Sequence, residues 1–444
     1  MKLSQDLLKI ISRSQSEPGW LADQRGAAWA RFEKQPLPTV KDEEWKYTSL
    51  KDFKLGEFLF NPEPKPGLSL RSATDLPDVL KELVLSRDEE GRQAEWSGVL
   101  VQSNGATLFE TISDALKAKG VILCDLKTAI QKHHDLVDPV LKEIRSASQS
   151  KFENLHQALW QGGTFIYVPE GVEIEAPVYN LVQLALPNTV IFPFTVIVVE
   201  PRARVTVIDE MVSDASPHHQ FSNGYHYMSV KESAELQYVN IQRWGSPVTH
   251  FDVQLAKLKR DAMFDSVNVG LGGQLMKANI HTLLEEKGAK ANLLGVFFGD
   301  QHQHFDFYTT QEHIAGETQS DLLFKSALKD HSQSSYQGIV RIPKGSQKSD
   351  AYQANKNLLL DENAKARSIP RLEIIADDVR CTHSATVGTV EDEGTFYLES
   401  RGLSHEEAVR MVVYGFFEQV IRRIPARDVR ERLHRAVVKK LEGR

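Results

Sequence analysis

The segment ESAELQYVNIQR, residues 232–243, decides the fold. It starts with a short polar turn, continues with a small residue, Ala234, and then alternates apolar with polar residues as a β-strand does. Measured from Ala203, equivalent alanines follow after 31 residues (Ala234), 28 more (Ala262) and 27 more (Ala289). The related segments are PRARVTVIDE (201–210), RDAMFDSVNVG (260–270), KGAKANLLGVFF (287–298), DHSQSSYQGIV (330–340) and ENAKARSIPRLEI (362–374).

This repeat belongs to a β-rich region of residues 161–390. Short runs of Val, Ile, Phe and Tyr follow one another there, separated by Gly, Pro, Asn and Asp. A β-rich repeat of this length without helical segments between the strands favours a β-solenoid. Periodicity alone leaves a β-sandwich open as the alternative.

The first 160 residues form a helix-rich domain in this interpretation. Residues 1–20 have the pattern of a short amphipathic helix, without the apolar core and cleavage site of a signal peptide. A hairpin is predicted in 98–109, with its turn at Asn104-Gly105. Further helices are predicted in 72–92, 111–120 and 138–163.

Residues 391–444 form a C-terminal helical domain. The first predicted helix ends at Gly402, and Ser404 with Glu407 three residues on gives the next a capping box. Between Met411 and Phe417 this helix is apolar almost all round, which predicts burial on more than one side.

The last 24 residues, 421–444, are strongly basic. They hold nine Lys and Arg against three Asp and Glu, although the whole chain has a net charge of −7. This second amphipathic helix either presents a solvated basic face or docks on an acidic partner.

The composition is that of an ordinary globular protein, with 41% hydrophobic and 25% charged residues. The negative net charge argues against nucleic-acid binding. No stretch approaches the roughly 20 apolar residues that cross a bilayer. The two cysteines, Cys124 and Cys381, form no disulfide framework, and we expect a cytoplasmic protein.

Cys381 and His383 are the most suggestive candidate metal ligands. They stand two residues apart in RCTHSATVG, residues 380–388, so on a strand their side chains share one face. Two ligands are too few for a stable zinc or iron–sulfur site. The pair is therefore either a structural coincidence or half of a site that another chain completes.

A second candidate group is His302, His304, Asp306 and His313. Two histidines and a carboxylate on one strand face are a known metal-binding pattern, so a stand-alone metal protein is one alternative. The sequence contains no phosphate-binding P-loop, no dinucleotide fingerprint and no G-x-S-x-G elbow. Another alternative is a β-helix enzyme acting on carbohydrate, although no cluster of carboxylates on one strand face is evident.

Residues 345–421 resemble the C-terminal half of the SufB/SufD family, the scaffold components of the SUF iron–sulfur cluster assembly system. The segments DEEWKYTSL (42–50) and LHQALWQGGTFIYVPEGV (155–172) resemble the same family, so the similarity covers essentially the whole chain. SufD is the more similar branch. SufB proteins carry a scaffold cysteine where this chain has Asn357, and a GHEAT-like run where this chain reads CTHSAT.

The resemblance implies a right-handed parallel β-helix core between helical domains, and a non-enzymatic scaffold subunit. It implies pairing with SufB through the β-helices, and docking of the ATPase SufC on residues 391–444. His383 would then face the SufB cysteine at a transient, nascent cluster, with Cys381 as a weaker candidate. No cofactor is expected to stay tightly bound to the isolated chain, which could pair with itself when SufB is absent. The expected partner-binding residues are Met411, Val412, Tyr414, Phe416 and Phe417.

Overall fold

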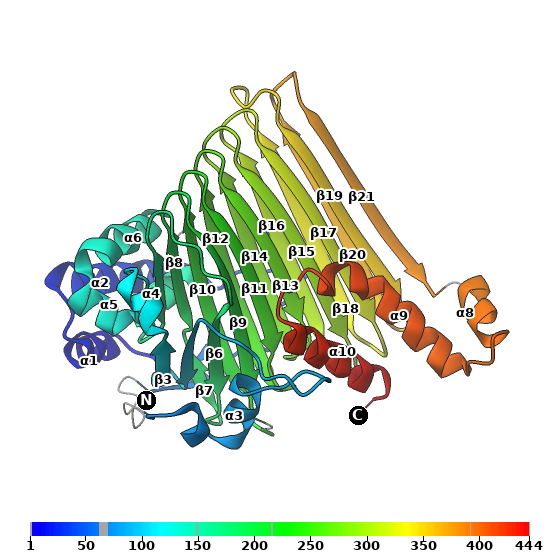
Figure 1. Cartoon of the computed structure of the whole chain (residues 1–444), viewed down its shortest axis with the longest axis horizontal. Coiled ribbons are helices and arrows are strands. Elements are labelled where there is room, and N and C mark those ends of the chain that lie inside the picture. Colours follow the sequence, from blue (N-terminus) through cyan, green and yellow to red (C-terminus); the bar gives the residue numbers. More distant parts are fainter. Residues whose placement is uncertain (1, 62–69, 148–149, 215, 391, 444) are drawn as a thin grey trace.

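A computed structural model describes residues 2–61, 70–147, 150–214, 216–390 and 392–443. Its core is a parallel β-solenoid in which two sheets face each other across a narrow lumen (Figure 1). The chain alternates between the sheets, which we call sheet I and sheet II. The predicted solenoid is confirmed, and the sandwich alternative is wrong because successive strands of each sheet pair in parallel over almost its whole length.

Sheet I ends at the strand β20, and sheet II ends at β21. The strands of sheet I are β4 (Ile122–Asp125), β5 (Thr164–Val168), β8 (Phe194–Val199), β10 (Gln220–Val230), β12 (Val248–Leu258), β14 (Leu275–Leu284), β16 (His304–His313), β18 (Gln333–Ile342) and β20 (Lys365–Ile374), with β1 (Leu59–Phe60) and β7 (Thr189–Ile191) at its side. Those of sheet II are β3 (Ala106–Ile112), β2 (Gly98–Ser103), β6 (Val178–Leu184), β9 (Arg204–Ser213), β11 (Glu235–Arg243), β13 (Met263–Gly270), β15 (Lys290–Gly299), β17 (Gln319–Leu328), β19 (Asp350–Leu359) and β21 (Arg380–Thr389).

The repeating alanines mark one corner of the solenoid. The residue before each of them adopts a left-handed backbone conformation, with φ of 61° at Arg202, 55° at Ser233 and 54° at Asp261. This tight turn buries the following alanine completely, and Ala234 and Ala262 are both 0% exposed. A larger side chain would not fit at this corner, so the spacing of the alanines reproduces the length of each turn.

Apolar side chains fill the lumen where the strands of sheet II begin. Val205, Leu236, Phe264 and Ala291 belong to one buried cluster, each from the same register position of successive strands. Strand alternation therefore gives every turn an inward-facing row that stacks on the rows of its neighbours.

N-terminal helices cover the outer face of sheet I and one end of the solenoid (Figure 1). They are α1 (Asp6–Gln15), α2 (Gly19–Lys34), α4 (Asp114–Ala118), α5 (Leu126–Lys132), α6 (His134–Ala147) and α7 (Lys151–Leu159), with 3₁₀ turns at Glu43–Trp45 and Leu55–Glu57. The helix α3 (Asp78–Val84) and the 3₁₀ turn at Ala73–Asp75 pack instead with residues of sheet II. The helix predicted in 72–92 is shorter than expected. The predicted hairpin is confirmed: Asn104 and Gly105 have φ of 51° and 85°, and β2 also joins sheet II beside β6.

The C-terminal helices are α8 (Asp392–Glu399), α9 (His405–Ile421) and α10 (Arg427–Leu441). The capping box of Ser404 and Glu407 is confirmed. One face of α9 packs on the outer face of sheet II through Val413 and Phe417, which are 0% and 1% exposed. The expected burial on more than one side is wrong, because the opposite face of α9 is open to solvent.

The basic residues of α10 fasten this helix to the solenoid. Arg432 pairs with the buried Glu210 at 3.0 Å, and Lys440 pairs with Asp300 at 2.8 Å. Burial would raise the pKa of Glu210, but Arg432 and Arg243 lower it to about 2. Much of the basic run thus serves contacts within the chain.

Candidate functional site at the open end of the solenoid

Cys381 and His383 lie on β21, the last strand of sheet II. In the parallel register, Cys381 pairs with Ala351 and His383 with Gln353, two residues that face the lumen. Both candidate ligands therefore point to the lumen side of the terminal turn, as strand alternation predicted. No further turn covers this one, and His383 is exposed to solvent.

The thiol of Cys381 is poorly prepared to bind a metal. It is partly buried against Val340, Ile342 and Ala351. Burial, and then the carboxylate of Asp350, raise the pKa of Cys381 to about 11, so the thiol is protonated at neutral pH. Because the thiolate is the ligand form, Cys381 is a weaker donor than the accessible imidazole of His383.

The two terminal strands differ in the edge that they offer to another chain. The N–H of Arg380 donates to the carbonyl oxygen of Ser349, just before β19, and the N–H of Lys365 donates to that of Ser332, just before β18. Because peptide groups alternate in direction, residues 381, 383, 385 and 387 of β21 turn theirs toward the free edge. In β20 the same alternation places Pro370, which has no N–H, at the free edge. Of these two strands, β21 is therefore the one whose free edge keeps all of its backbone N–H donors.

Two apolar side chains of the terminal turn are exposed. Ile375, directly after β20, is 68% exposed, and Val387, near the C-terminal end of β21, is 49% exposed. An exposed apolar group beside an unpaired strand edge is typical of a surface that pairs with another chain.

The expected partner-binding residues on α9 fall into two groups. Met411 and Tyr414 are 51% and 44% exposed, whereas Val412 and Phe416 are half-buried. Phe417 lies in the core between α9 and sheet II, so the structure removes it from any partner surface. Phe396 and Tyr397 of α8, which the sequence did not single out, are exposed as well, at 71% and 59%.

The second group of candidate ligands is dispersed. His302 lies in a turn and stacks on His331, with ring centroids 5.1 Å apart. His304 faces outward and contacts the hydroxyl of Thr48, which donates a hydrogen bond to Asp306. His313 faces the lumen and bonds Thr318 and Ser320. A shared metal site is therefore not formed.

The other cysteine, Cys124, is also poorly suited to bind a metal. Cys124 lies on β4, at the covered end of sheet I, and is buried. Burial raises its pKa far above the usual range. Among the described residues, no group of three or more His, Cys, Asp and Glu side chains is arranged to hold a metal ion.

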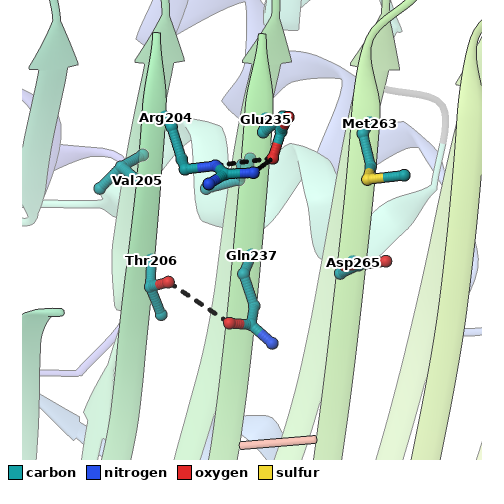
Figure 2. A pocket seen from close by; sticks show the side chains of 8 residues that line it. Arg204, Val205, Thr206, Glu235, Gln237, Met263 and Asp265 are labelled. Carbon is teal, nitrogen blue, oxygen red and sulfur yellow. Dashed lines mark hydrogen bonds and ion pairs between the residues drawn. The ribbon is translucent and has the colours of Figure 1, made fainter. Parts of the chain in front are cut away.

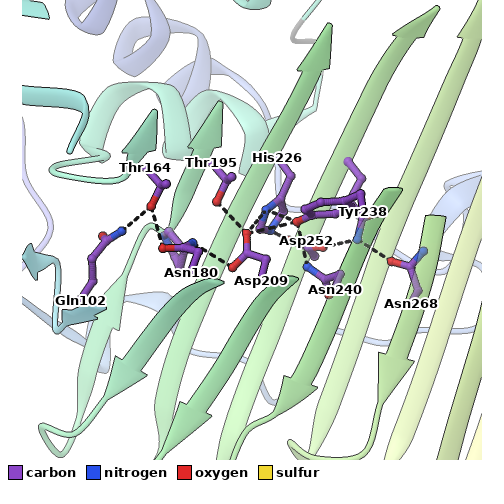
Figure 3. Close-up of polar contacts among 12 residues, drawn as sticks. Gln102, Thr164, Asn180, Thr195, Asp209, His226, Tyr238, Asn240, Asp252 and Asn268 are labelled. Atoms are coloured by element: carbon purple, nitrogen blue, oxygen red, sulfur yellow. Dashed lines mark hydrogen bonds and ion pairs between the residues drawn. The ribbon is translucent and has the colours of Figure 1, made fainter. Parts of the chain in front are cut away.

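A buried polar network inside the lumen was not predicted (Figure 3). Its centre is His226, whose two ring nitrogens lie 3.2 Å from Asp209 and 2.9 Å from Asp252. Burial would lower the pKa of His226, but the carboxylates of Asp252 and Asp209 raise it to about 10. The network continues through Asn180, which donates to Asp209, and Tyr238, whose hydroxyl lies 2.8 Å from His226.

The outer face of sheet II holds a shallow groove (Figure 2). Its lining side chains are largely paired with one another: Arg204 with Glu235, and Thr206 with Gln237. Asp265 accepts a hydrogen bond from Asn292. Carboxylates that are already paired in this way give no support to the carbohydrate-enzyme alternative.

Two family models match adjoining ranges of the chain. Residues 182–416 match the family described as "SUF system FeS cluster assembly, SufBD core domain", and residues 99–184 match "SufBD protein N-terminal region". The chain is 29% identical to the iron-sulfur cluster assembly protein SufD of Bacillus subtilis, over 100% of this chain and 99% of that protein. It is 26% identical to SufB of the same organism, over 99% and 93%. No helix among the described residues is long and apolar enough to cross a membrane.

Proposed function

This chain belongs to the SufB/SufD family of the SUF iron–sulfur cluster assembly system, and from that premise we propose that it acts as a SufD-like, non-catalytic scaffold subunit. The observation that carries the proposal is the exposed imidazole of His383 on an uncapped terminal turn. One exposed ligand beside an unpaired edge is what an incomplete, inter-subunit site requires.

The first partner in this proposal is a SufB-like chain. It adds a strand to the free edge of β21, because main-chain hydrogen bonds then satisfy the unpaired groups of residues 381–387. The exposed Val387 and Ile375 are covered in the same step. In the absence of this partner, a second copy of the chain is proposed to occupy the same edge.

Iron and sulfide are the cargo that the paired chains hold. His383 provides an imidazole, a good ligand for iron, and the partner supplies thiolate. Cys381 can join only after losing its proton, which burial opposes. The isolated chain is therefore proposed to hold no cluster tightly, and its place of action is proposed to be the cytoplasm.

The second partner is a SufC-like ATPase that docks on α8 and α9. Phe396 and Tyr397 on α8 and Met411 and Tyr414 on the adjoining α9 are exposed apolar side chains. Figure 1 shows α8 lying outside the sheets, directly after β21. Movement of this helix on ATP binding would reach the strand that carries His383, since only a few residues separate them.

The test of the cluster site is the His383→Ala variant in a complex co-expressed with SufB-like and SufC-like chains. We expect the complex to assemble normally and its iron content to fall severalfold, because one ligand is lost. His302→Ala, which removes another exposed histidine, is the matched control. Normal iron content in an intact His383→Ala complex would contradict the proposal.

The ATPase surface is tested with Tyr414→Ala and Met411→Ala. Each is expected to weaken co-purification of the ATPase. Met411→Ala should leave the free energy of unfolding within about 0.5 kcal/mol of the native value, while Tyr414→Ala also loses the stacking of its ring on His434, with centroids 4.2 Å apart. Phe417→Ala should behave in the opposite way, with a loss of about 3–5 kcal/mol from the core. If ATPase binding is unchanged in both surface variants, α9 is not the docking site.

A further inference from the structure

Gln353 is the nearest lumen-facing neighbour of His383. It lies on β19, and its Cα is the register partner of His383 on β21. Neighbouring strands run about 4.8 Å apart, so two side chains on the same face at one register position lie side by side. Gln353 thus occupies the floor of the open turn, directly beneath the imidazole.

The amide of Gln353 is buried without a partner. The residue is 0% exposed, and neither its Nε2 nor its Oε1 makes a hydrogen bond to any described residue. A buried amide left in this state costs about 1–3 kcal/mol, so such groups are nearly always paired.

The surroundings of the amide are shaped to keep it in place. A Cβ atom on Gly338 would lie 2.4 Å from Gln353 Nε2 and 2.4 Å from the hydroxyl of Tyr336. Only glycine leaves this room. The hydroxyl of Tyr336 bonds that of Thr309 at 2.9 Å, and no hydrogen bond joins it to the amide of Gln353. On β21, in the terminal turn, the residue in register with Gln353 is His383.

The chemistry of a histidine ligand calls for such a neighbour. When one ring nitrogen binds a metal, the other carries a proton and usually donates it to an oxygen, which fixes the tautomer and the ring orientation. The carbonyl oxygen of a glutamine amide is a suitable acceptor. No acidic residue occupies the lumen-facing positions of β21, which are Cys381, His383, Ala385, Val387 and Thr389.

We propose that Gln353 is a positioning residue that accepts a hydrogen bond from the inner nitrogen of His383, so that the outer nitrogen is free for iron. The inference rests on the proposed function in taking His383 as the cluster ligand. It adds the residue that orients this ligand, and assigns to Gly338 the role of keeping space for the amide.

The tautomer of His383 in the isolated full-length chain is the direct readout. Histidine-labelled protein is examined by aromatic ¹³C NMR, and the His383 signal is identified as the one missing from His383→Ala. We expect a single tautomer in the native chain. Gln353→Met keeps the length of the side chain but removes the acceptor. In this variant the His383 signal should move to the chemical shift of an imidazole that averages both tautomers, as expected for the exposed His218 and His219. Gln353→Glu, which restores an acceptor oxygen, should return it.

Gln337 provides the matched control. It is also buried with both amide atoms unpartnered among the described residues, but it follows the lumen-facing Tyr336 and so lies on the outer face of sheet I. Gln337→Met is expected to leave the His383 signal unchanged. If it moves the signal as much as Gln353→Met does, or if Gln353→Met does not move it at all, the proposal is wrong. Should Gln353→Met fail to fold, Gln353→Ala provides the same comparison.

Iron retention in the co-expressed complex distinguishes a failure of this inference from a failure of the proposed function. There, Gln353→Met is expected to lower iron retention about tenfold, while Gln337→Met leaves it unchanged. One possible result is that Gln353→Met changes the tautomer of His383, while the complexes of Gln353→Met and His383→Ala both keep their normal iron content. This result would overturn the proposed function but leave the contact between Gln353 and His383 standing. A changed tautomer with iron lost only in His383→Ala would show that orientation is dispensable, and would overturn the role of Gln353.

Discussion

Asp209, His226 and Asp252 place three ionisable groups in the lumen of a protein whose interior is otherwise mainly apolar. Two carboxylates hold one imidazolium between them, and hydrogen bonds from Asn180 and Thr195 satisfy Asp209 further. A buried charge is stable only with such partners, so each member of this group depends on the others.

Replacement of His226 is expected to show this dependence as a function of pH. His226→Gln leaves the two carboxylates without their cation and should destabilise the chain by about 3–5 kcal/mol near pH 6. The pKa of His226 is about 10 in the folded chain against about 6.5 unfolded, so its contribution is complete below pH 6.5 and is lost as the pH rises toward 10. The difference between the two proteins should therefore narrow between pH 7 and 10.

Urea unfolding at several pH values measures this difference. His302→Gln, in an exposed turn, is the control and should cost little at any pH. A gap between His226→Gln and the native chain that stays constant from pH 6 to pH 10 would contradict the assignment of the proton to His226.

The repeat contained a signal for this network. Asn180, Asp209, Asn240 and Asn268 occupy one register position of successive strands. The last three of these polar residues each stand six positions after a repeat alanine, so an alignment of the repeats by their alanines already groups them. Their partners His226 and Asp252 come from the opposite sheet, and the pairing across the lumen depends on a distance that one strand pattern does not encode.

At the scale of elements, α10 is attached to the solenoid by charge as well as by apolar contact. Arg432 approaches Glu210, which is 1% exposed at its side chain, and Val429 and Leu433 pack beside it. The basic run was visible in the sequence. Its acidic counterpart was not, because Glu210 stands more than 200 residues earlier.

Arg432→Met is therefore expected to cost more than an ordinary surface change. Glu210 would remain buried without its main partner, and the free energy of unfolding should fall by about 3–5 kcal/mol. Arg435→Met on the same helix, where the side chain is exposed, should change it by less than about 0.5 kcal/mol. If chemical denaturation shows the same small change in the free energy of unfolding for Arg432→Met and Arg435→Met, the pair of Arg432 with Glu210 contributes little.

The helix α9 shows where periodicity misleads. Its central run from Met411 to Phe417 is apolar on nearly every side, which predicts a helix buried on more than one side. Only Val413 and Phe417 reach the core, while Met411 and Tyr414 remain exposed. A sequence records which faces are apolar, but not whether the covering surface belongs to the same chain.

At the scale of the whole molecule, the corner alanines favoured a solenoid but left a sandwich open, and Asn104-Gly105 predicted the hairpin, because both signals depend on local turns. The location of Cys381 and His383 at the last turn was not predictable from the spacing of two residues. It follows from the number of turns and from the point where α8 begins.

Blocking the edge of β21 tests how the molecule joins its partner. Ala385→Pro removes an N–H that faces the free edge, and leaves the bonds of β21 to β19 intact. We expect at least a tenfold loss of affinity for the SufB-like chain, and little change in the thermal stability of the isolated chain. Ala366→Pro, at the equivalent edge of β20 near Pro370, is the control and should bind normally. If Ala385→Pro and Ala366→Pro bind the SufB-like chain with the same affinity, the free edge of β21 is not where the two chains join.

The two ends of the solenoid are unlike. In the described residues, sheets I and II end on one side in the short antiparallel strands β4 and β3, and on the other in the ten-residue strands β20 and β21. Two molecules that meet at their long strands leave no comparable edge for a third. Polymerisation into fibres is thus prevented by shape alone, and the assembled mass should reach a plateau at two such chains however high the concentration is raised.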